Sequence, residues 1–250
     1  MTEARVLTCA DSRYFHFLPF FEANVERKFG VLPLIYDLGL TEAQRASLRS
    51  EVRRVAVPED FAGISHGFVR ATHKPACIAD AFDTCPGGVL YADADLLFVG
   101  PVTRHDLGEA DIAVTPRTAR ERRPDYLAKG SINAGLLYFA GTPPSRALVA
   151  AWAEACTVGD RGDQIALSDL LAGFDLLGPL GPATRDGMTV LKLDARVFND
   201  TRLKTGRVLH FKNAGRDPRV TAKLDRFRGF EERHPRALAA YLATRRTIGV

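Results

Sequence analysis

Short apolar runs alternate with stretches of helical spacing along most of this chain. Residues 5–11 form an apolar run that ends in a polar turn, and apolar residues then recur from Tyr14 to Phe29, with Gly30 after them. This pattern predicts a strand followed by a helix that ends at Gly30. Pro19 is compatible with that helix only in its first turn.

The same alternation of strand and helix continues to residue 115. It predicts strands over residues 31–36, 52–57, 89–92 and 112–115, and helices over residues 41–50, where Thr41–Gln44 forms a capping box, and 73–82. Strands and helices in alternation are typical of an α/β fold with a mostly parallel central sheet between helices. Ligands of such sheets bind at the carboxyl ends of the strands.

The remainder of the chain predicts a further strand at residues 131–139, helices at 144–156 and 163–171, and late strands at 188–193 and 208–211. Residues 116–130 are basic and aperiodic, which suggests a mobile active-site loop. Residues 220–246 have a helical pattern interrupted at Pro235. Because there is no repeat or linker, we expect one domain over residues 1–219, with 220–250 as a basic helical extension packed on it.

Two carboxylates one residue apart follow a short apolar run that predicts a buried strand. Asp93 and Asp95 come just after the run 89–92, and a second apolar run, 96–99, follows them. In an extended chain, residues i and i+2 point to the same side, so the two carboxylates should face together. Buried carboxylates repel, and a hard divalent cation removes that repulsion. An ordinary pair of turn aspartates is the alternative, but the apolar flanks favour a metal site.

Composition and charge narrow the protein class. A chain of 250 residues with 46% hydrophobic and 26% charged residues is long and apolar enough to bury a substantial core. No apolar run approaches the ~18 residues of a membrane span, and the first residues lack a signal-peptide pattern. We therefore expect a cytoplasmic protein, with peripheral association at the inner membrane surface as a second expectation. The four cysteines lack C-x-x-C spacing and predict buried thiols.

Positive charge gathers near the carboxyl end. Residues 202–246 contain 13 Lys or Arg and four Asp or Glu, a balance of +9 within a total of +4, so the rest of the chain carries −5. Such a segment suggests an acidic partner, such as a nucleotide phosphate, an anionic lipid or nucleic acid. A solvated basic helix is the alternative.

Several short motifs in order give the chain a resemblance to a known family. Lys74-Pro75, Tyr91-Ala92-Asp93-Ala94-Asp95, Asn133-Ala134-Gly135, Asp163-Gln164 and His210 resemble, in order and spacing, the GT-A fold glycosyltransferases related to family eight. The resemblance covers roughly residues 5–216. It implies a single Rossmann-like GT-A domain, a nucleotide-sugar donor, most often a UDP-sugar, Mn²⁺ or Mg²⁺, and retention of anomeric configuration. It departs from the family at Ala92, where relatives often have Leu, and in the absence of a Gly three residues after His210.

The resemblance also implies roles for particular residues. It places Asp93, Asp95 and His210 at the metal and Asp163, Gln164 and Asn133 beside the reacting sugar. The remaining donor contacts that it implies are Cys9, Ala10, Asp11 and Tyr14 at the base and ribose, Lys74, Ala134 and Gly135 near the sugar, and Arg216 on the diphosphate.

Each of these residues has a plainer interpretation. Lys74 also fits a surface lysine at a helix start, Asn133 a turn residue, Asp163 the N-cap of its helix, and His210 a core histidine. At the level of function, the alternatives are a haloacid-dehalogenase-type phosphatase and a non-enzymatic binder of nucleic acid or membrane. The phosphatase normally requires a hydroxyl residue where Leu96-Leu97 stand, and the binder depends on the basic segment alone. The acceptor suggested by the charge is acidic or phosphate-bearing, such as a lipid-linked glycan or, less favoured, modified nucleic acid.

Overall fold

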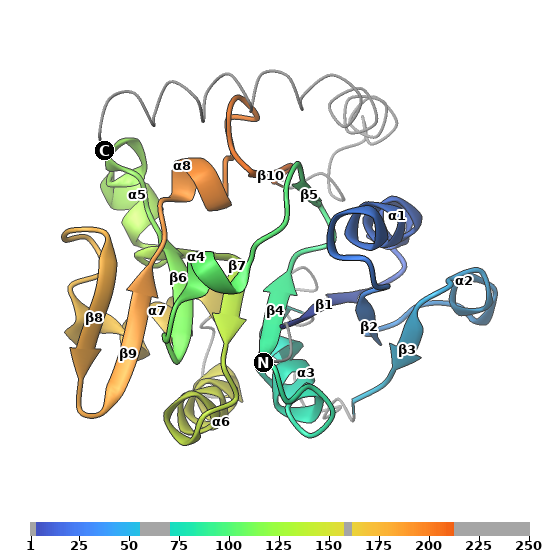
Figure 1. Ribbon diagram of the computed structural model, residues 1–250, viewed down its shortest axis with the longest axis horizontal. Coiled ribbons are helices and arrows are strands. Elements are labelled where there is room, and N and C mark those ends of the chain that lie inside the picture. The colour runs from blue at the N-terminus through green and yellow to red at the C-terminus, as the bar shows by residue number, and fades with distance from the viewer. Residues whose placement is uncertain (1–3, 56–70, 158–161, 213–250) are drawn as a thin grey trace.

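The computed structural model describes residues 4–55, 71–157 and 162–212, and its centre is a twisted sheet of eight strands (Figure 1). In spatial order the strands are β3 (Glu51–Arg53), β2 (Leu34–Asp37), β1 (Arg5–Ala10), β4 (Val89–Ala92), β7 (Ile132–Phe139), β6 (Ile112–Pro116), β9 (Met188–Lys192) and β8 (Gly181–Arg185). The pairs β3–β2, β2–β1, β1–β4 and β6–β9 are parallel, whereas β7 is antiparallel to both neighbours and β8 to β9. The mixed, mostly parallel α/β sheet predicted from the sequence is therefore confirmed.

Helices cover both faces of this sheet (Figure 1). On one face α3 (Lys74–Ala81) and α6 (Pro143–Thr157) pack against each other and against Leu7, Tyr91 and Phe139. On the other face α1 (Leu18–Phe29) packs on Val6 and Leu90. Neighbouring residues of one strand thus enter different cores, as the two-residue period of a strand requires. The remaining helical segments are η1 (Phe15–Phe17), α2 (Glu42–Ala46), η2 (Ala71–His73), α4 (Arg104–Leu107), η3 (Ala119–Glu121), α5 (Pro124–Leu127), α7 (Asp163–Leu170), η4 (Ala172–Phe174) and α8 (Ala195–Phe198).

A second, two-stranded sheet lies beyond the end of β4. β5 (Leu96–Phe98) pairs antiparallel with β10 (Val208–His210), and Leu96 faces His210 across the pair. The apolar side chains of both strands are fully buried, which fixes the register of this small sheet.

Several predicted boundaries were wrong. The second strand begins at Leu34 because Val31 is exposed, and the helix opened by Thr41 ends at Ala46. Residues 116–130 are not aperiodic throughout, since they contain η3 and α5. The edge strand β8 was missed because its polar, exposed residues give no apolar signal. The predictions for residues 56–57, Arg216 and the extension 220–250 lie outside the described residues.

None of the helices in the described ranges combines the length and apolar composition that crossing a membrane requires.

A buried carboxylate stabilises the turn after β2. Asp37 Oδ1 accepts hydrogen bonds from the backbone N–H groups of Gly39 and Leu40, at 2.7 and 2.6 Å. Its Oδ2 pairs with Arg45 and Arg54, at 3.0 and 2.8 Å. Burial by itself would raise the pKa of Asp37, but the hydrogen bonds from Leu40, Gly39 and the two arginines outweigh burial and lower it.

A lowered pKa in the folded state predicts how stability depends on pH. Asp37 stabilises the fold above its unfolded pKa, ~3.9, and this contribution is lost as the pH falls through the lower, folded value. We expect Asp37→Asn to lower the free energy of unfolding by about 1.5–3 kcal/mol at pH 7, with a smaller deficit near pH 3. Urea titrations at the two pH values measure this. Asp83→Asn, which changes an exposed carboxylate with a single ion pair to Arg146, is the control. An equal deficit for Asp37→Asn at both pH values would contradict the assignment.

Candidate functional site

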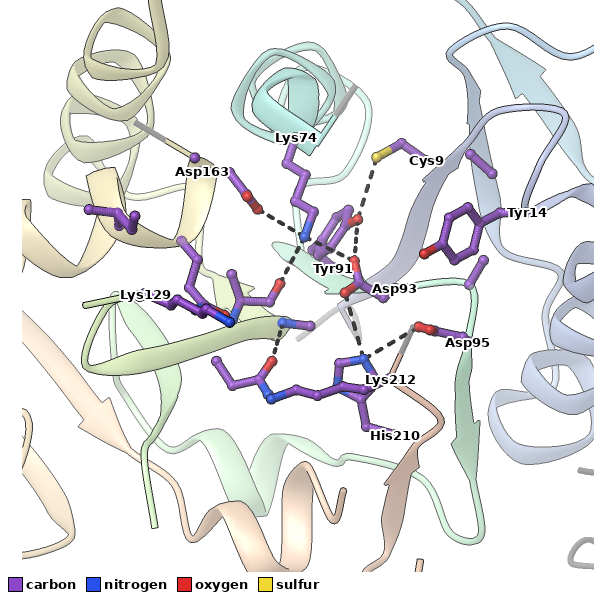
Figure 2. A pocket seen from close by; sticks show the side chains of 18 of the residues that line it. Cys9, Tyr14, Lys74, Tyr91, Asp93, Asp95, Lys129, Asp163, His210 and Lys212 are labelled. Atoms are coloured by element: carbon purple, nitrogen blue, oxygen red, sulfur yellow. Dashed lines mark hydrogen bonds and ion pairs between the residues drawn. The ribbon is translucent and has the colours of Figure 1, made fainter. Parts of the chain in front are cut away.

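A pocket of about 670 Å³ opens where the carboxyl ends of β1 and β4 meet the start of β7. Segments from β10 and the first turn of α7 complete its walls (Figure 2). The expected site residues that fall in the described ranges all line this pocket: Cys9, Ala10, Asp11, Tyr14, Lys74, Asp93, Asp95, Asn133, Ala134, Gly135, Asp163, Gln164 and His210. Residues far apart in the sequence are therefore brought to one place.

An acidic cluster with one imidazole lies on the floor of the pocket. One ligand atom each from Asp93, Asp95 and His210 lies within 4.8 Å of the others. His210 Nε2 is 3.4 Å from Asp95 Oδ1 and 3.9 Å from Asp93 Oδ2. Figure 2 shows the three side chains converging from two segments of the chain.

Backbone pairing explains how these three residues meet. The Asp93 N–H donates to the Gly135 carbonyl at 2.8 Å, which holds the turn after β4 against β7. β10 then lies beside β5, and the Phe211 N–H donates to the Asp95 carbonyl at 3.0 Å. This pairing brings His210 beside the turn that carries Asp95, so the imidazole reaches the Asp95 carboxylate.

This cluster fits a divalent cation. The side chain of Asp95 is buried, and within the described residues its carboxylate contacts the His210 imidazole at 3.4 Å and accepts no hydrogen bond. A buried charge with so little compensation is costly, and a cation removes the cost. Two carboxylates and one imidazole are suitable ligands for Mn²⁺, and carboxylates also suit Mg²⁺.

A buried lysine links this cluster to α7. Lys74 Nζ lies 3.0 Å from Asp93 Oδ1 and 3.0 Å from Asp163 Oδ2, and donates to the Ala134 carbonyl at 3.3 Å (Figure 2). Burial by itself would lower the pKa of Lys74, but the charges of Asp163 and Asp93 outweigh it, so the pKa lies above its usual value. Lys74 is therefore a buried cation and not the surface lysine of the plainer interpretation.

Asp163 differs from its expected N-cap role. Gly162 is the N-cap of α7 and no side chain caps the helix, so Asp163 occupies the first helical position. Its carboxylate instead contacts Lys74, while its backbone carbonyl accepts a hydrogen bond from Trp152 Nε1 at 2.8 Å. The contact with Lys74 is an ion pair of 3.0 Å between two buried side chains. The ion pair and the Trp152 bond fix the start of α7 at the pocket.

Tyr91 is hydrogen bonded to Asp93. Its hydroxyl donates to Asp93 Oδ1 at 2.8 Å and lies 3.4 Å from Cys9 Sγ. Lys74 Nζ lies 5.1 Å from the centre of the ring. Burial and the negative charge of Asp93 raise the pKa of Tyr91, so the hydroxyl remains a donor at neutral pH. Asp93 is thus held by two donors, whereas Asp95 is not.

The strand β7 and the helix α7 form one wall of the pocket. Gln164 Oε1 accepts from the Ala134 N–H at 3.2 Å, and Gln164 Nε2 donates to the Lys129 carbonyl. Asn133 Oδ1 accepts from the Gly135 N–H at 3.0 Å. These bonds orient both amides along the wall. Asn133 is a buried strand residue and not the turn residue of the plainer interpretation.

Positive charge lies beside this wall, because the Arg117 N–H donates to the Ser131 carbonyl just before β7. Arg117 is buried and donates to the Gly130 carbonyl at 3.2 Å, and Glu121 lies 3.7 Å from both Arg117 and Lys212. Burial and the nearby Arg117 lower the pKa of Lys212. Two cations share one carboxylate, which makes this wall suitable for an anionic ligand.

The end of β1 forms a further part of the pocket. Asp11 accepts hydrogen bonds from the backbone N–H of Arg13 at 2.9 Å and from its guanidinium at 2.9 and 2.7 Å. Cys9 and Tyr14 also line this part of the pocket (Figure 2). A flat, partly apolar surface with a fixed carboxylate suits a nucleoside, whose ribose hydroxyls are donors.

Several residues of the site have no role predicted from the sequence. Tyr91 and Lys212 each stand two residues from a predicted metal ligand, and the period of a strand would have placed them on the same side. Asn199, which contacts His210, gives no local signal because it belongs to an irregular segment between α8 and β10.

Comparison with solved structures identifies the fold. The chain is similar to the galactosyltransferase LgtC in complex with donor and acceptor sugar analogues, with a TM-score of 0.51 and 23% identity over 85% of this chain and 82% of that chain. It is similar to an active-site mutant of LgtC, with a TM-score of 0.50 and 24% identity over 77% and 74%. It is also similar to a glycosyltransferase involved in glycosylation of the major capsid of PBCV-1, with a TM-score of 0.53 and 11% identity over 85% and 96%.

These likenesses show the fold of the chain, which is that of the GT-A glycosyltransferases. The GT-A fold predicted from the sequence is therefore confirmed. No protein-family model and no curated protein sequence matches the chain.

The ion pairs of Lys74 yield a test of the site's electrostatics. Lys74→Met leaves Asp93 and Asp163 without their shared cation, and we expect it to lower the free energy of unfolding by about 3–5 kcal/mol. Adding Asp163→Asn should recover part of this loss, because one of the two uncompensated charges is then gone. Chemical denaturation of the single and double variants measures the coupling.

Lys192 provides the matched control for this cycle. It is also buried, but its ammonium donates to the carbonyls of Asp175 and Phe174, at 3.0 and 3.5 Å. Asp163→Asn should therefore not improve the stability of Lys192→Met. Strictly additive effects of Lys74→Met and Asp163→Asn would contradict the proposed coupling.

Proposed function

We propose that this protein is a metal-dependent glycosyltransferase that moves a sugar from a nucleoside diphosphate donor, with a UDP-sugar favoured, to an acceptor. The observation that carries this proposal is the buried cluster of Asp93, Asp95 and His210 at the end of β4. Asp93, Asp95 and Asp163 carry three negative charges, and Lys74 supplies one positive charge among them. The two charges left over match one divalent cation.

Asp93, Asp95 and His210 would hold Mn²⁺ or Mg²⁺. When bound, the cation neutralises charge on the diphosphate as the glycosidic bond breaks. Tyr91 and Lys74 fix the direction of the Asp93 carboxylate, through contacts of 2.8 and 3.0 Å. These residues therefore provide a site that needs little rearrangement when the donor binds.

The donor would lie across the pocket. Cys9, Ala10, Asp11 and Tyr14 line the end of β1, where we place the base and ribose. Ala134 and Gly135 at the start of β7 lie next to Asp93, and we place the sugar there. Arg216, outside the described residues, is proposed to bind the diphosphate through its planar guanidinium.

Asp163, Gln164 and Asn133 have positional roles beside the sugar in this proposal. Asp163 is held by Lys74 at 3.0 Å, and Gln164 is hydrogen bonded to Ala134 at 3.2 Å. A carboxylate that is paired with a buried ammonium is a poor nucleophile, because attack would break the ion pair. We therefore propose transfer without a covalent bond to Asp163. Retention of configuration is proposed on the resemblance to family eight alone.

The acceptor is proposed to be acidic or phosphate-bearing, such as a lipid-linked glycan. Arg117, Lys129 and Lys212 line one side of the pocket. The balance of +9 over residues 202–246 adds to this charge. A cytoplasmic enzyme at an anionic membrane surface is consistent with both features.

The two alternatives receive less support. Leu96 and Leu97 are fully buried in β5, so the segment after the acidic pair offers no hydroxyl to a phosphatase reaction. A binder that uses only the basic segment leaves the buried cluster of Asp93, Asp95 and His210 without a purpose.

Asp95→Asn tests the metal site and the reaction together. We expect hydrolysis of nucleotide sugars in the presence of Mn²⁺ to fall by roughly 100-fold or more, because the cation stabilises the leaving group. The thermal stability should not fall, since removing a poorly compensated buried charge relieves repulsion.

The measurement is release of nucleoside diphosphate from a panel of nucleotide sugars, with and without a chelator. Asp186→Asn is the control, because Asp186 lies at the exposed β8–β9 turn and its positive φ of 50° is one that Asn tolerates. Full activity of Asp95→Asn, or undiminished wild-type activity in excess chelator, would refute the metal-dependent reaction.

We propose that substitutions of His210 and Arg216 change the Mn²⁺ dependence of activity in different ways. His210→Ala should raise the Mn²⁺ concentration required for half-maximal activity, and excess Mn²⁺ should restore part of the rate. Arg216→Ala should lower kcat/KM by roughly 30- to 1,000-fold at any Mn²⁺ concentration, because it removes a charged contact to the leaving group. Metal titrations of both variants separate the two roles. The same response to Mn²⁺ in both would contradict this division.

A further inference from the structure

The ring of His210 is held from behind by a buried amide. His210 Nδ1 lies 2.7 Å from Asn199 Oδ1, and both side chains are buried. Asn199 Nδ2 donates to Thr115 Oγ1 at 2.9 Å. Thr115 Oγ1 donates in turn to the Asn133 carbonyl at 3.0 Å. The four groups form one chain of hydrogen bonds from β7, through β6, to β10.

The direction of this chain follows from its last member. The Asn133 carbonyl only accepts, so the hydroxyl hydrogen of Thr115 is used there. Thr115 Oγ1 must then accept from the NH₂ group of Asn199, which turns the amide oxygen toward His210. A carbonyl oxygen accepts, so His210 Nδ1 carries a hydrogen. The lone pair of the neutral ring is then on Nε2, which faces Asp95 and Asp93.

The ring is also confined sterically by Gly135. A Cβ atom at this position would lie 2.5 Å from His210 Cε1 and 2.8 Å from His210 Nδ1. Cβ atoms in proteins essentially never come so close to other non-bonded atoms, so the backbone of β7 approaches the ring as closely as only glycine permits. Contact on this side and the hydrogen bond to Asn199 leave the ring little freedom to rotate.

We propose that Asn199 is a positioning residue that fixes the tautomer and the orientation of His210 for a divalent cation. This inference rests on the metal site of the proposed function. A histidine presents either nitrogen to a cation, and the partner of the other nitrogen selects which one. Here the Asn199 amide, which Thr115 orients, selects the nitrogen. Asn199 lies outside the sequence motifs named above.

The experiment measures Mn²⁺ binding directly, from the electron paramagnetic resonance signal of the free ion in titrations of the full chain. Asn199→Ala should raise the Kd for Mn²⁺ roughly 10- to 100-fold. Thr115→Val keeps the shape of the side chain but removes the group that orients the amide, and should raise the Kd by roughly 3- to 10-fold. Thr115→Ser keeps the hydroxyl and should bind Mn²⁺ within about twofold of the wild type.

Asn24 is a matched control for the loss of a buried amide. It exchanges two hydrogen bonds with the backbone of Phe98 in β5, at 2.9 and 2.8 Å, and does not contact His210. Asn24→Ala loosens the neighbourhood of β5 without changing the partner of the ring, so its Kd for Mn²⁺ should stay close to that of the wild type. Thermal unfolding of every variant shows that the compared proteins are folded. If Asn199→Ala does not fold, the Thr115→Val and Thr115→Ser pair decides the question.

The outcomes separate this inference from the proposed function. Weaker binding in Asn199→Ala and Thr115→Val, but not in Thr115→Ser or Asn24→Ala, supports the role of Asn199. Wild-type binding that Asp95→Asn removes, together with unchanged binding in Asn199→Ala or in Thr115→Val, overturns the inference and leaves the metal site in place. An equal loss in Asn24→Ala and Asn199→Ala also overturns it. A wild type that binds no Mn²⁺ overturns the metal site and this inference together.

Discussion

Repulsion between buried carboxylates is the constraint on which the rest of this site depends. Asp93 and Asp163 share one buried ammonium, that of Lys74, with contacts of 3.0 Å each. Asp95 has no such partner in the described part of the chain beyond the imidazole of His210 at 3.4 Å. A fold that retains a buried charge in this way loses stability unless a cation balances it. A divalent cation that also binds phosphate oxygens would balance this charge and bind a ligand at the same time.

The strands of the fold hold these charged residues in fixed positions. The β4 strand delivers Asp93 to the centre of the sheet, and the small β5–β10 sheet returns a much later segment to the same point. Gly135 lets β7 approach the His210 ring, while Thr115 and Asn199 brace the ring from β6 and from the segment before β10. His210, the proposed metal ligand, is thus tied by hydrogen bonds to β7, the strand that we propose to bind the donor sugar.

The sequence predicted the elements that bury apolar residues, because alternation and helical spacing report burial directly. It located β4, β7 and α6 closely, and the i, i+2 spacing of Asp93 and Asp95 predicted their shared direction. It failed where contacts are long-range or polar. The edge strand β8 lacks an apolar face. Asp163 fits an N-cap by its position in the sequence, but its carboxylate forms an ion pair with Lys74 from a different helix. Asn199 was overlooked because its role depends on a ring eleven residues away that only the folded chain brings beside it.

Anomalous X-ray diffraction from crystals grown with Mn²⁺ and uridine diphosphate tests the central claim most directly. Data collected on both sides of the manganese absorption edge locate the ion without reference to any assumed chemistry. The account predicts one strong peak in contact with the carboxylate of Asp95 and with Nε2 of His210, close to Asp93, with the diphosphate oxygens completing the coordination. A nucleotide bound in this pocket with manganese elsewhere, or with His210 turned to present Nδ1, would contradict it.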